Sequence, residues 1–299
     1  MFPIILGSGG VPASEGWKNT HGIIGFGWTP RADTNIINSA GVIASDVTAS
    51  GVTARGYVTG CEFGGDKGLF FGGYYGSWAW WGGSNIVSNT GVIASDVSAV
   101  GSARGNAPGV HFGTDQGLIG FGGSTSTMTN KVSNLGVVQS DVTIPSGITQ
   151  RSADDCACEY GGDKALFGFT GSVNVTNHIS NTGVVAADTA SVVGVTYRDA
   201  AGGVDWGGDK GIFAYGSDSL PHVSNLVNNV GITASDVAGV GTARPTGGCA
   251  EYGTDKGIFA FGGANLTTTN RVSNLGVVQS NGQTAGSGKN SCGGCSFGT

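Results

Sequence analysis

Hydrophobic residues in this chain fall into short runs that are bounded by glycine and by small polar residues. One such run, Gly257-Ile-Phe-Ala-Phe-Gly-Gly263 in its clearest copy, follows an Asp-Lys pair, and similar runs occur six times along the chain. Short runs rich in β-branched and aromatic residues, separated by turn residues, predict β-strands. No convincing amphipathic helical period is present, so the pattern predicts an all-β protein.

The recurring motif has a nearly fixed period. Its copies begin near residues 20, 66, 115, 163, 209 and 255, at spacings of 46, 49, 48, 46 and 46 residues, and the first copy is degenerate. Each period can be divided into four short strands joined by tight turns. Four strands in a period of this size are typical of one blade of a β-propeller. Six units therefore predict a six-bladed propeller. A parallel β-solenoid, which usually has shorter coils, is the competing fold.

The two ends of the repeat region complement each other. The pattern begins at Thr20, where the second strand of a unit starts, and the chain ends with Cys295-Ser-Phe-Gly-Thr299, which matches the first strand Cys61-Glu-Phe-Gly-Gly65. The C-terminal strand is therefore expected to join the N-terminal blade, which closes the ring and removes its open edges.

We assign the propeller to residues 18–299. Residues 1–17 have no place in the blade pattern, and we interpret them as an arm that docks onto a neighbouring protein or as a strap across the ring. The docking arm is favoured because its apolar residues would otherwise be exposed to solvent. These residues are Phe2, Ile4, Ile5 and Leu6.

Composition narrows the classes of function. Gly supplies 58 of 299 residues, and charged residues make up only 11%, against roughly 25% in an average globular protein. Hydrophobic residues, at 39%, are sufficient to form a core. The net charge of -6 argues against nucleic-acid binding, and no apolar run is long enough for membrane insertion. The N-terminal segment lacks the basic residues and the long apolar run of a secretory signal, so folding in a cytoplasm is expected.

The repeat resembles a known family. Arg244, followed by a strand and then by Gly257-Ile-Phe-Ala-Phe-Gly-Gly263, resembles the kelch repeat. The wider recurring pattern of Asp-Lys-Gly-Ile-Phe, Val-Ser-Asn, Ser-Asp-Val and Arg is similar to that of Gly-rich kelch-like repeat proteins of tailed bacteriophage virions, over almost the whole chain. This resemblance implies a structural or host-attachment role in the virion. The partners it implies are other virion proteins and a host surface glycan or receptor, and homo-oligomerisation is left open.

Two polar positions recur in nearly every repeat. An aspartate follows the third strand and an arginine comes 8–10 residues later, whereas the last unit has Asn281 and Lys289. Because both members change together, we predict that they contact each other and staple each blade by charge-assisted hydrogen bonds. The alternative is a ring of carboxylates that binds a metal or a substrate. The predicted pairs are Asp46 with Arg55, Asp96 with Arg104, Asp141 with Arg151, Asp188 with Arg198, and Asp236 with Arg244.

Other residues that could bind metal have simpler interpretations. The aspartate of each Asp-Lys turn could ligate Ca²⁺, but capping of the turn is favoured. Cys292 and Cys295 have the spacing of a zinc or redox motif, yet no second such pair accompanies them. A disulfide between Cys292 and Cys249 or Cys295 stays open. Cysteine alternates with Val and Ala at one position of the first strand, which is typical of a small buried residue.

The sequence gives little support for catalysis. None of the four histidines lies in a recognisable nucleophile or metal motif. Asp154 and Asp155 could be imagined as a carboxylate pair for glycan cleavage, but they are adjacent in a polar loop and no second acid is indicated. We therefore predict that the protein is not an enzyme and has no cofactor and no metal site.

Unrepeated residues gather between the second and third strands and between consecutive units, and these connections are expected on one face of the ring. The second unit is unusual because Tyr74-Tyr-Gly-Ser-Trp-Ala-Trp-Trp-Gly-Gly83 holds three of the six tryptophans. Aromatic rings stack on sugars or are buried in interfaces. Binding is favoured over packing between subunits or within the chain. The predicted binding residues are Trp28, Tyr74, Tyr75, Trp78, Trp80 and Trp81.

The sequence thus favours a non-enzymatic component of a phage virion that attaches to a host surface or glycan as part of a tail or fibre. A decoration or connector protein of the capsid, neck or baseplate, held by its N-terminal arm, is the first alternative. A glycan-cleaving propeller enzyme is the second, and it requires acids that converge at the mouth of the ring.

Overall fold

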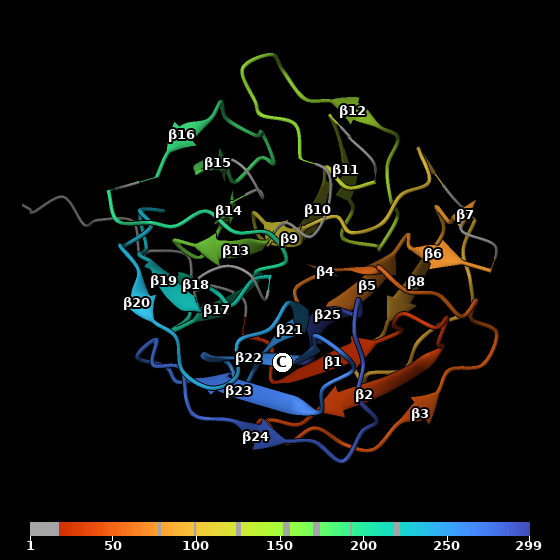
Figure 1. Ribbon diagram of the computed structural model, residues 1–299. Coiled ribbons are helices and arrows are strands. Elements are labelled where there is room, and N and C mark those ends of the chain that lie inside the picture. Colours follow the sequence, from red (N-terminus) through yellow and green to blue (C-terminus); the bar gives the residue numbers. More distant parts are fainter. Residues whose placement is uncertain are drawn as a thin grey trace, which may run out of the picture.

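Figure 1 shows a computed structural model of the chain, which describes residues 18–76, 79–98, 100–123, 127–151, 156–169, 174–191, 193–217 and 222–299. Within these ranges the regular structure consists of β-strands and no helix is present. The strands form six small antiparallel sheets arranged radially around a central axis. The protein is a six-bladed β-propeller, as the repeat predicts.

The sheets are described from the central axis outward. Blade 1 contains β25 (Gly293–Phe297), β1 (His21–Gly25), β2 (Asp33–Ile37) and β3 (Val47–Thr48), and blade 2 contains β4 (Thr59–Phe63), β5 (Lys67–Phe71) and β8 (Ser84–Val87). Blade 3 contains β9 (Gly109–Phe112), β10 (Gln116–Gly120), β11 (Met128–Val132) and β12 (Val142–Thr143), and blade 4 contains β13 (Ala157–Tyr160), β14 (Lys164–Phe167), β15 (Val175–Ile179) and β16 (Thr189–Ala190). Blade 5 contains β17 (Gly202–Trp206), β18 (Lys210–Ala214), β19 (Val223–Val227) and β20 (Val237–Ala238), and blade 6 contains β21 (Thr246–Tyr252), β22 (Lys256–Gly262), β23 (Thr268–Val272) and β24 (Gly282–Gln283).

The C-terminal strand closes the ring, which confirms the sequence prediction. β25 pairs with β1 in antiparallel register from His21 opposite Phe297 to Gly25 opposite Gly293. The turns between first and second strands are also linked around the ring by backbone hydrogen bonds. At the closure, the amide of Gly298 donates to the carbonyl of Asp66 at 2.8 Å. Blade 1 thereby has four strands like most of its neighbours, and β1 is not left as an unpaired edge.

Blade 2 departs from the four-stranded pattern. Its outer strand is reduced to a bridge in which the backbones of Ser84 and Val97 exchange hydrogen bonds of 3.1 and 2.9 Å. Between its second and third strands the chain forms an additional hairpin, β6 (Tyr74–Tyr75) and β7 (Ala79–Trp80). The structure describes the unusual aromatic segment except for residues 77 and 78.

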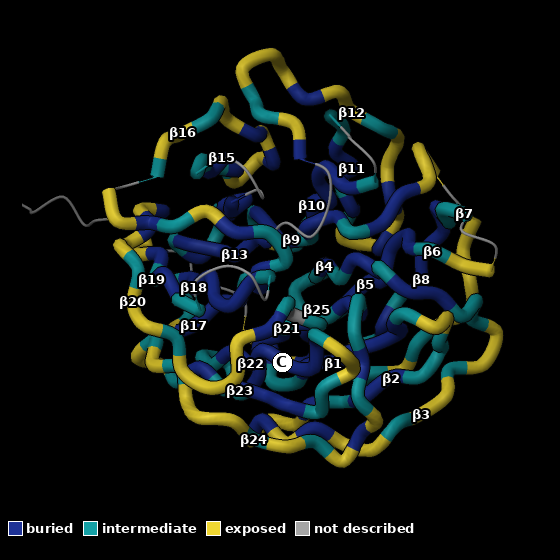
Figure 2. Tube along the Cα trace, viewed as in Figure 1, coloured by how far each residue is buried: buried dark blue, intermediate teal, exposed yellow. Residues whose placement is uncertain are grey.

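The hydrophobic core lies between blades. One cluster joins Cys61 and Leu69 of blade 2 to Ile119 and Val132 of blade 3, all fully buried. The second strand of each blade is a continuous run of apolar residues because a neighbouring blade covers each of its faces. Figure 2 shows the resulting gradient from buried inner strands to an exposed rim.

The inner strands approach one another closely around the axis. A Cβ atom on Gly60 would lie 1.8 Å from the carbonyl oxygen of Gly294 in blade 1, and one on Gly203 would lie 2.1 Å from the carbonyl oxygen of Ala157 in blade 4. Glycine is therefore required at these points of the first strand. The close packing leaves a narrow central channel in which side chains of six blades meet.

Candidate functional site

The variable connections share one face of the ring, as predicted. The connections between second and third strands hydrogen-bond to the connections between blades: the amide of Gly73 donates to the carbonyl of Arg104 at 3.0 Å, and that of Gly123 to the carbonyl of Gly105 at 2.8 Å. We call this side the loop face and the side with the Asp-Lys turns the turn face. Loops on a rigid scaffold are common positions for binding sites.

The aromatic residues of blades 1 and 2 form a pocket on the loop face. Its volume is about 220 Å³, and it is lined by Trp28, Thr29, Pro30, Tyr74, Tyr75 and Gly76. We call it the aromatic pocket. Tyr75 is 40% exposed. The structure thus brings three of the predicted binding residues, from two blades, to one place.

A row of aromatic rings in edge-to-face and tilted contact supports this pocket. The ring centroids of Trp28 and Tyr57 are 5.2 Å apart, those of Tyr57 and Tyr74 are 6.0 Å apart, and those of Tyr74 and Trp80 are 3.9 Å apart. Rings in such contact fix one another's orientation, so the pocket wall is held before any ligand arrives. Trp80 therefore contributes through Tyr74, and Tyr57 is a member of the row that the sequence interpretation missed.

Trp81 is not among the described residues that line the aromatic pocket. Its ring centroid lies 4.1 Å from the guanidinium carbon of Arg55, and the ring centroid of Phe26 in blade 1 lies 4.0 Å from the same carbon. Trp81 and Phe26 therefore both pack on an arginine between blades 1 and 2. Trp78, the predicted docking arm and the adjacent acids at positions 154 and 155 lie outside the described residues.

The predicted Asp–Arg partners were wrong. Arg104 does not pair with Asp96 but with Asp141, to which its Nη1 lies at 3.6 Å. Lys289 contacts Asp46 of blade 1 at 2.9 Å, and Arg55 interacts electrostatically with Asp96. Each basic residue therefore belongs with the aspartate of the following repeat. The 8–10 residues between predicted partners carry the chain from the outer rim of one blade to the inner strand of the next, which separates them.

The corrected arrangement is a staple that recurs around the ring. In blade 2, Nη2 of Arg55 donates to Oδ1 of Asn85 at 2.6 Å, and Nδ2 of Asn85 donates to Asp96 at 2.9 Å. The amide of Thr53 in the preceding connection also donates to Asp96 at 3.0 Å. Burial lowers the pKa of Arg55. Partial burial opposes the ionisation of Asp96, but the hydrogen bonds from Thr53 and Asn85 lower its pKa.

A second group of polar residues, which the sequence interpretation missed, lies in the channel. Each inner strand places one side chain there, at the position directly after the Cys, Val or Ala position: Glu62, His111, Glu159, Asp205, Glu251 and Ser296. We call this set the channel ring. In a chain with only 11% charged residues, four acids and a histidine at one repeat position were a visible signal. The sequence interpretation missed this signal because it looked for acids that are adjacent in sequence.

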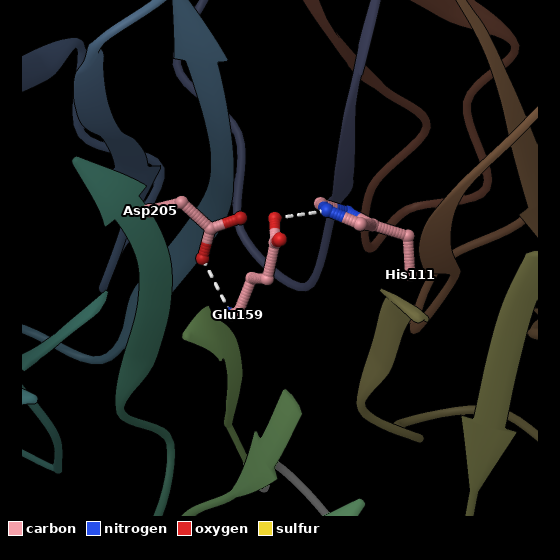
Figure 3. Close-up of side chains that lie close together, drawn as sticks. All are labelled: His111, Glu159 and Asp205. Carbon is pink, nitrogen blue, oxygen red and sulfur yellow. Dashed lines mark hydrogen bonds and ion pairs between the residues drawn. The ribbon is translucent and has the colours of Figure 1, made fainter. Parts of the chain in front are cut away.

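Hydrogen bonds link neighbouring members of the channel ring. The amide of Glu159 donates to Oδ1 of Asp205 at 2.5 Å, the amide of Glu251 to Oγ of Ser296 at 2.8 Å, and the amide of Ser296 to Oε1 of Glu62 at 2.8 Å. Nε2 of His111 contacts Oε2 of Glu159. Figure 3 shows Glu159 lying between His111 and Asp205, with the three side chains converging from β9, β13 and β17.

Burial changes the protonation of this ring. The exposed fraction is 1% for His111, 4% for Glu159 and 8% for Asp205. Burial and the neighbouring Glu159 raise the pKa of Asp205 to about 8, and burial raises the pKa of Glu251 well above its usual range. Burial opposes protonation of His111, but the adjacent Glu159 raises its pKa well above the ordinary value.

A cavity of about 150 Å³ adjoins the channel ring. Glu62, Asp205, Glu251 and Ser296 contribute to its lining, together with glycine and alanine residues at the starts of the inner strands. Sites for small organic ligands usually measure about 300–1,000 Å³, so the space is suited to ions and water. Acids therefore do converge in this propeller, beside a cavity at its axis.

Comparisons with known proteins support the fold. No family profile matches the sequence, and no curated protein matches it. Among solved structures, the chain is similar to a protein of unknown function from Bacteroides caccae, with a TM-score of 0.53 and 13% sequence identity over 93% of this chain and 99% of that one. A likeness at this identity shows the propeller fold alone.

The remaining predictions concern the turns, the cysteines and the membrane. In the turn between the first and second strands, the aspartate contacts other side chains: Lys67 contacts Asp66 within its own turn, and Nδ2 of Asn134 donates to Asp115 at 2.9 Å. The six cysteines all lie in described ranges and form no disulfide, so Cys292 is not bonded to Cys249 or Cys295. Among the described residues, no helix is long and apolar enough to cross a membrane.

Proposed function

We propose that this propeller is a non-enzymatic carbohydrate-binding protein that serves as a host-attachment component of a phage virion. The observation that carries the proposal is the aromatic pocket, in which Trp28 of blade 1 and Tyr74 and Tyr75 of blade 2 line one depression on the loop face. Edge-to-face contacts through Tyr57 keep the rings of Trp28 and Tyr74 in place.

The chemistry of the pocket suits a sugar. Aromatic rings with one apolar surface and one polar edge can cover the apolar face of a pyranose while their O–H and N–H groups remain available for hydrogen bonds. The pocket of about 220 Å³ is below the usual size for a drug-like ligand. It fits a single sugar unit at the surface of a longer glycan better than a small molecule that is enclosed on all sides.

The non-enzymatic part of the proposal rests on where the acids lie. None of the six residues that line the aromatic pocket carries a carboxylate or an imidazole, and glycoside hydrolysis commonly uses a pair of carboxylates on either side of the scissile bond. Three of the four acids of the channel ring, Glu159, Asp205 and Glu251, are buried, and the ring adjoins a separate cavity. The virion part of the proposal is supported by the resemblance of the repeats to phage kelch-like proteins.

The proposal is tested by binding of the fluorescently labelled full chain to a panel of bacterial strains. The comparison is between the wild type, Trp28→Ala with Tyr75→Ala, and Tyr197→Ala. Tyr197 is the matched control because it is a tyrosine outside the pocket with 43% exposure, against 40% for Tyr75. We expect saturable binding to some strains by the wild type and the control, loss of binding by the pocket variant, and loss after periodate oxidation of the cell-surface glycans.

Three results would contradict the proposal. Binding that survives periodate but is lost after protease treatment would indicate a protein receptor. Binding that the pocket variant retains would place the site elsewhere. No binding by a folded wild type would favour the decoration or connector role, in which the aromatic pocket is buried against another virion protein.

A further inference from the structure

We propose that the channel binds one divalent transition-metal ion through His111, Glu159 and Asp205, and that this ion joins blades 3, 4 and 5. The three residues come from the inner strands β9, β13 and β17. They are 48 and 46 residues apart in sequence, and the packing of three consecutive blades around the axis brings them together. Figure 3 shows how their side chains point toward a common centre.

The geometry is close to that of a bound ion. One ligand atom from each residue can be chosen so that all three lie within 4.8 Å of one another. Three ligand atoms that are each about 2.1 Å from one metal ion lie at most about 3.6 Å from one another. Closing the site therefore needs side-chain shifts of up to about an ångström, and Nε2 of His111 and Oε2 of Glu159 must move apart to admit the ion. The ion would replace the direct contact between His111 and Glu159.

Unsatisfied oxygen atoms give independent support for a ligand. Oε1 of Glu159 and Oε2 of Glu251 are buried and have no hydrogen-bond partner among the residues that the structure describes. Both residues are only 4% exposed. A buried carboxylate oxygen without a partner is costly, and native structures usually satisfy such atoms. A cation beside Glu159 satisfies its oxygen directly.

The charge around the site also calls for a cation. Four carboxylates of the channel ring, Glu62, Glu159, Asp205 and Glu251, face a single imidazole. No lysine or arginine is among the described residues that line the adjoining cavity. Without a metal, the repulsion can be relieved only by protons shared among the acids. A divalent ion neutralises two of the charges and releases protons as it binds.

The donor set selects the class of ion. One imidazole nitrogen with two carboxylates suits Zn²⁺ and Mn²⁺. Ca²⁺ takes six to eight oxygen ligands, and an imidazole is a poor substitute for one of them. The adjoining cavity of about 150 Å³ can hold the waters that complete the coordination sphere.

The test uses the full chain without a polyhistidine tag, freed of metal with a chelator and titrated calorimetrically with Zn²⁺, Mn²⁺ or Ca²⁺. We expect one Zn²⁺ or Mn²⁺ per chain in the wild type. Glu159→Gln and Asp205→Asn should bind at least about 100-fold more weakly, because loss of even a residue that only orients a ligand costs about 10–100-fold. Asp255→Asn is the matched control, since it removes the same charge from a turn on the turn face.

Thermal unfolding separates loss of the site from loss of the fold. The Asp205→Asn variant keeps a side-chain oxygen that can accept from the amide of Glu159, and it removes one buried charge. In chelator its melting temperature should equal or exceed that of the wild type, and Zn²⁺ should raise only the melting temperatures of the wild type and the Asp255→Asn control.

Absorption of the Co²⁺-loaded wild type gives a readout that needs no variant. Ligand-field bands without a thiolate charge-transfer band are expected from nitrogen and oxygen ligands. Four results would overturn the proposal. The wild type could fail to bind Zn²⁺ or Mn²⁺, or it could prefer Ca²⁺. Both channel variants could keep the wild-type affinity for the metal, or a thiolate band could assign the ion to the cysteines.

Discussion

At the scale of residues, the recurring polar positions hold neighbouring blades together. The buried guanidinium of Arg104 is 3% exposed, lies 3.6 Å from Asp141 and donates to the carbonyl of Phe121 at 2.7 Å. Its guanidinium carbon also lies 5.3 Å from the ring centroid of Phe71 in blade 2. One side chain thus connects an aspartate, a backbone carbonyl and an aromatic ring of the adjoining blade.

Arg104→Met should lower the free energy of unfolding by about 3 kcal/mol, because removal of one partner leaves buried acceptors without a donor. Lys67→Met is the control. It removes a lysine that is 38% exposed and pairs with Asp66 at the surface, and such pairs contribute about 0–1 kcal/mol. Urea denaturation of both variants measures the difference. Equal decreases in the free energy of unfolding would show that Arg104 stabilises the fold no more than a surface ion pair does.

The aspartates of the staples determine the response to acid. Partial burial opposes their ionisation, but hydrogen bonds from the neighbouring connection lower the pKa of Asp141, Asp188 and Asp236 below the ordinary value. A lowered pKa in the folded state stabilises the protein above the ordinary pKa of aspartate, and this contribution is lost as the pH falls through the folded value. The melting temperature should therefore fall between about pH 4 and pH 2. A melting temperature that stays constant over this range would contradict the assignment.

At the scale of elements, the sequence predicted the blades better than the contacts between them. The period of the apolar runs, the Asp-Lys turns and the matching ends were local or repeated signals, and they predicted six sheets and their closure by β25. The partners of Asp46 and Arg55 were wrong because linear distance does not reveal on which side of a blade the chain crosses. The channel ring was missed because its members are a full repeat apart.

The closing strand offers a direct test at this scale. Deletion of residues 291–299 removes β25, which pairs with β1 and covers a core cluster through the buried residues Cys295 and Phe297. The deletion should strongly lower the melting temperature, since it leaves β1 as an unpaired edge and uncovers that core cluster. Removal of Thr299 alone, which is exposed, is the control. Thermal unfolding that is unchanged by the longer deletion would refute closure by this strand.

At the scale of the whole molecule, the ring separates two sites. The aromatic pocket lies on the loop face, over blades 1 and 2, whereas the proposed metal site lies in the channel between blades 3, 4 and 5. The additional hairpin of blade 2 supplies part of the pocket lining, and the aromatic residues of this segment were predicted from the sequence to bind. Trp28 was also predicted to bind, but only the structure shows that it lies beside Tyr74, because the two residues belong to different blades.

The proposed function and the metal site can therefore be tested independently. A variant of the channel ring should leave glycan binding intact, because none of its residues lines the aromatic pocket. A variant of the pocket should leave metal binding intact for the same reason. The resemblance to phage proteins concerns the repeats as a whole and bears on the biological setting of the protein rather than on either site.

Sugar binding by the aromatic pocket is tested most directly by the affinity of the full chain for bacterial surface polysaccharides immobilised on an array. We predict that the wild type and Tyr197→Ala bind the same polysaccharides equally, whereas Trp28→Ala loses about 2 kcal/mol of binding free energy, or about 30-fold in affinity. Two results would contradict sugar binding by this pocket. Trp28→Ala could bind as tightly as the wild type, or the wild type could bind no polysaccharide on the array.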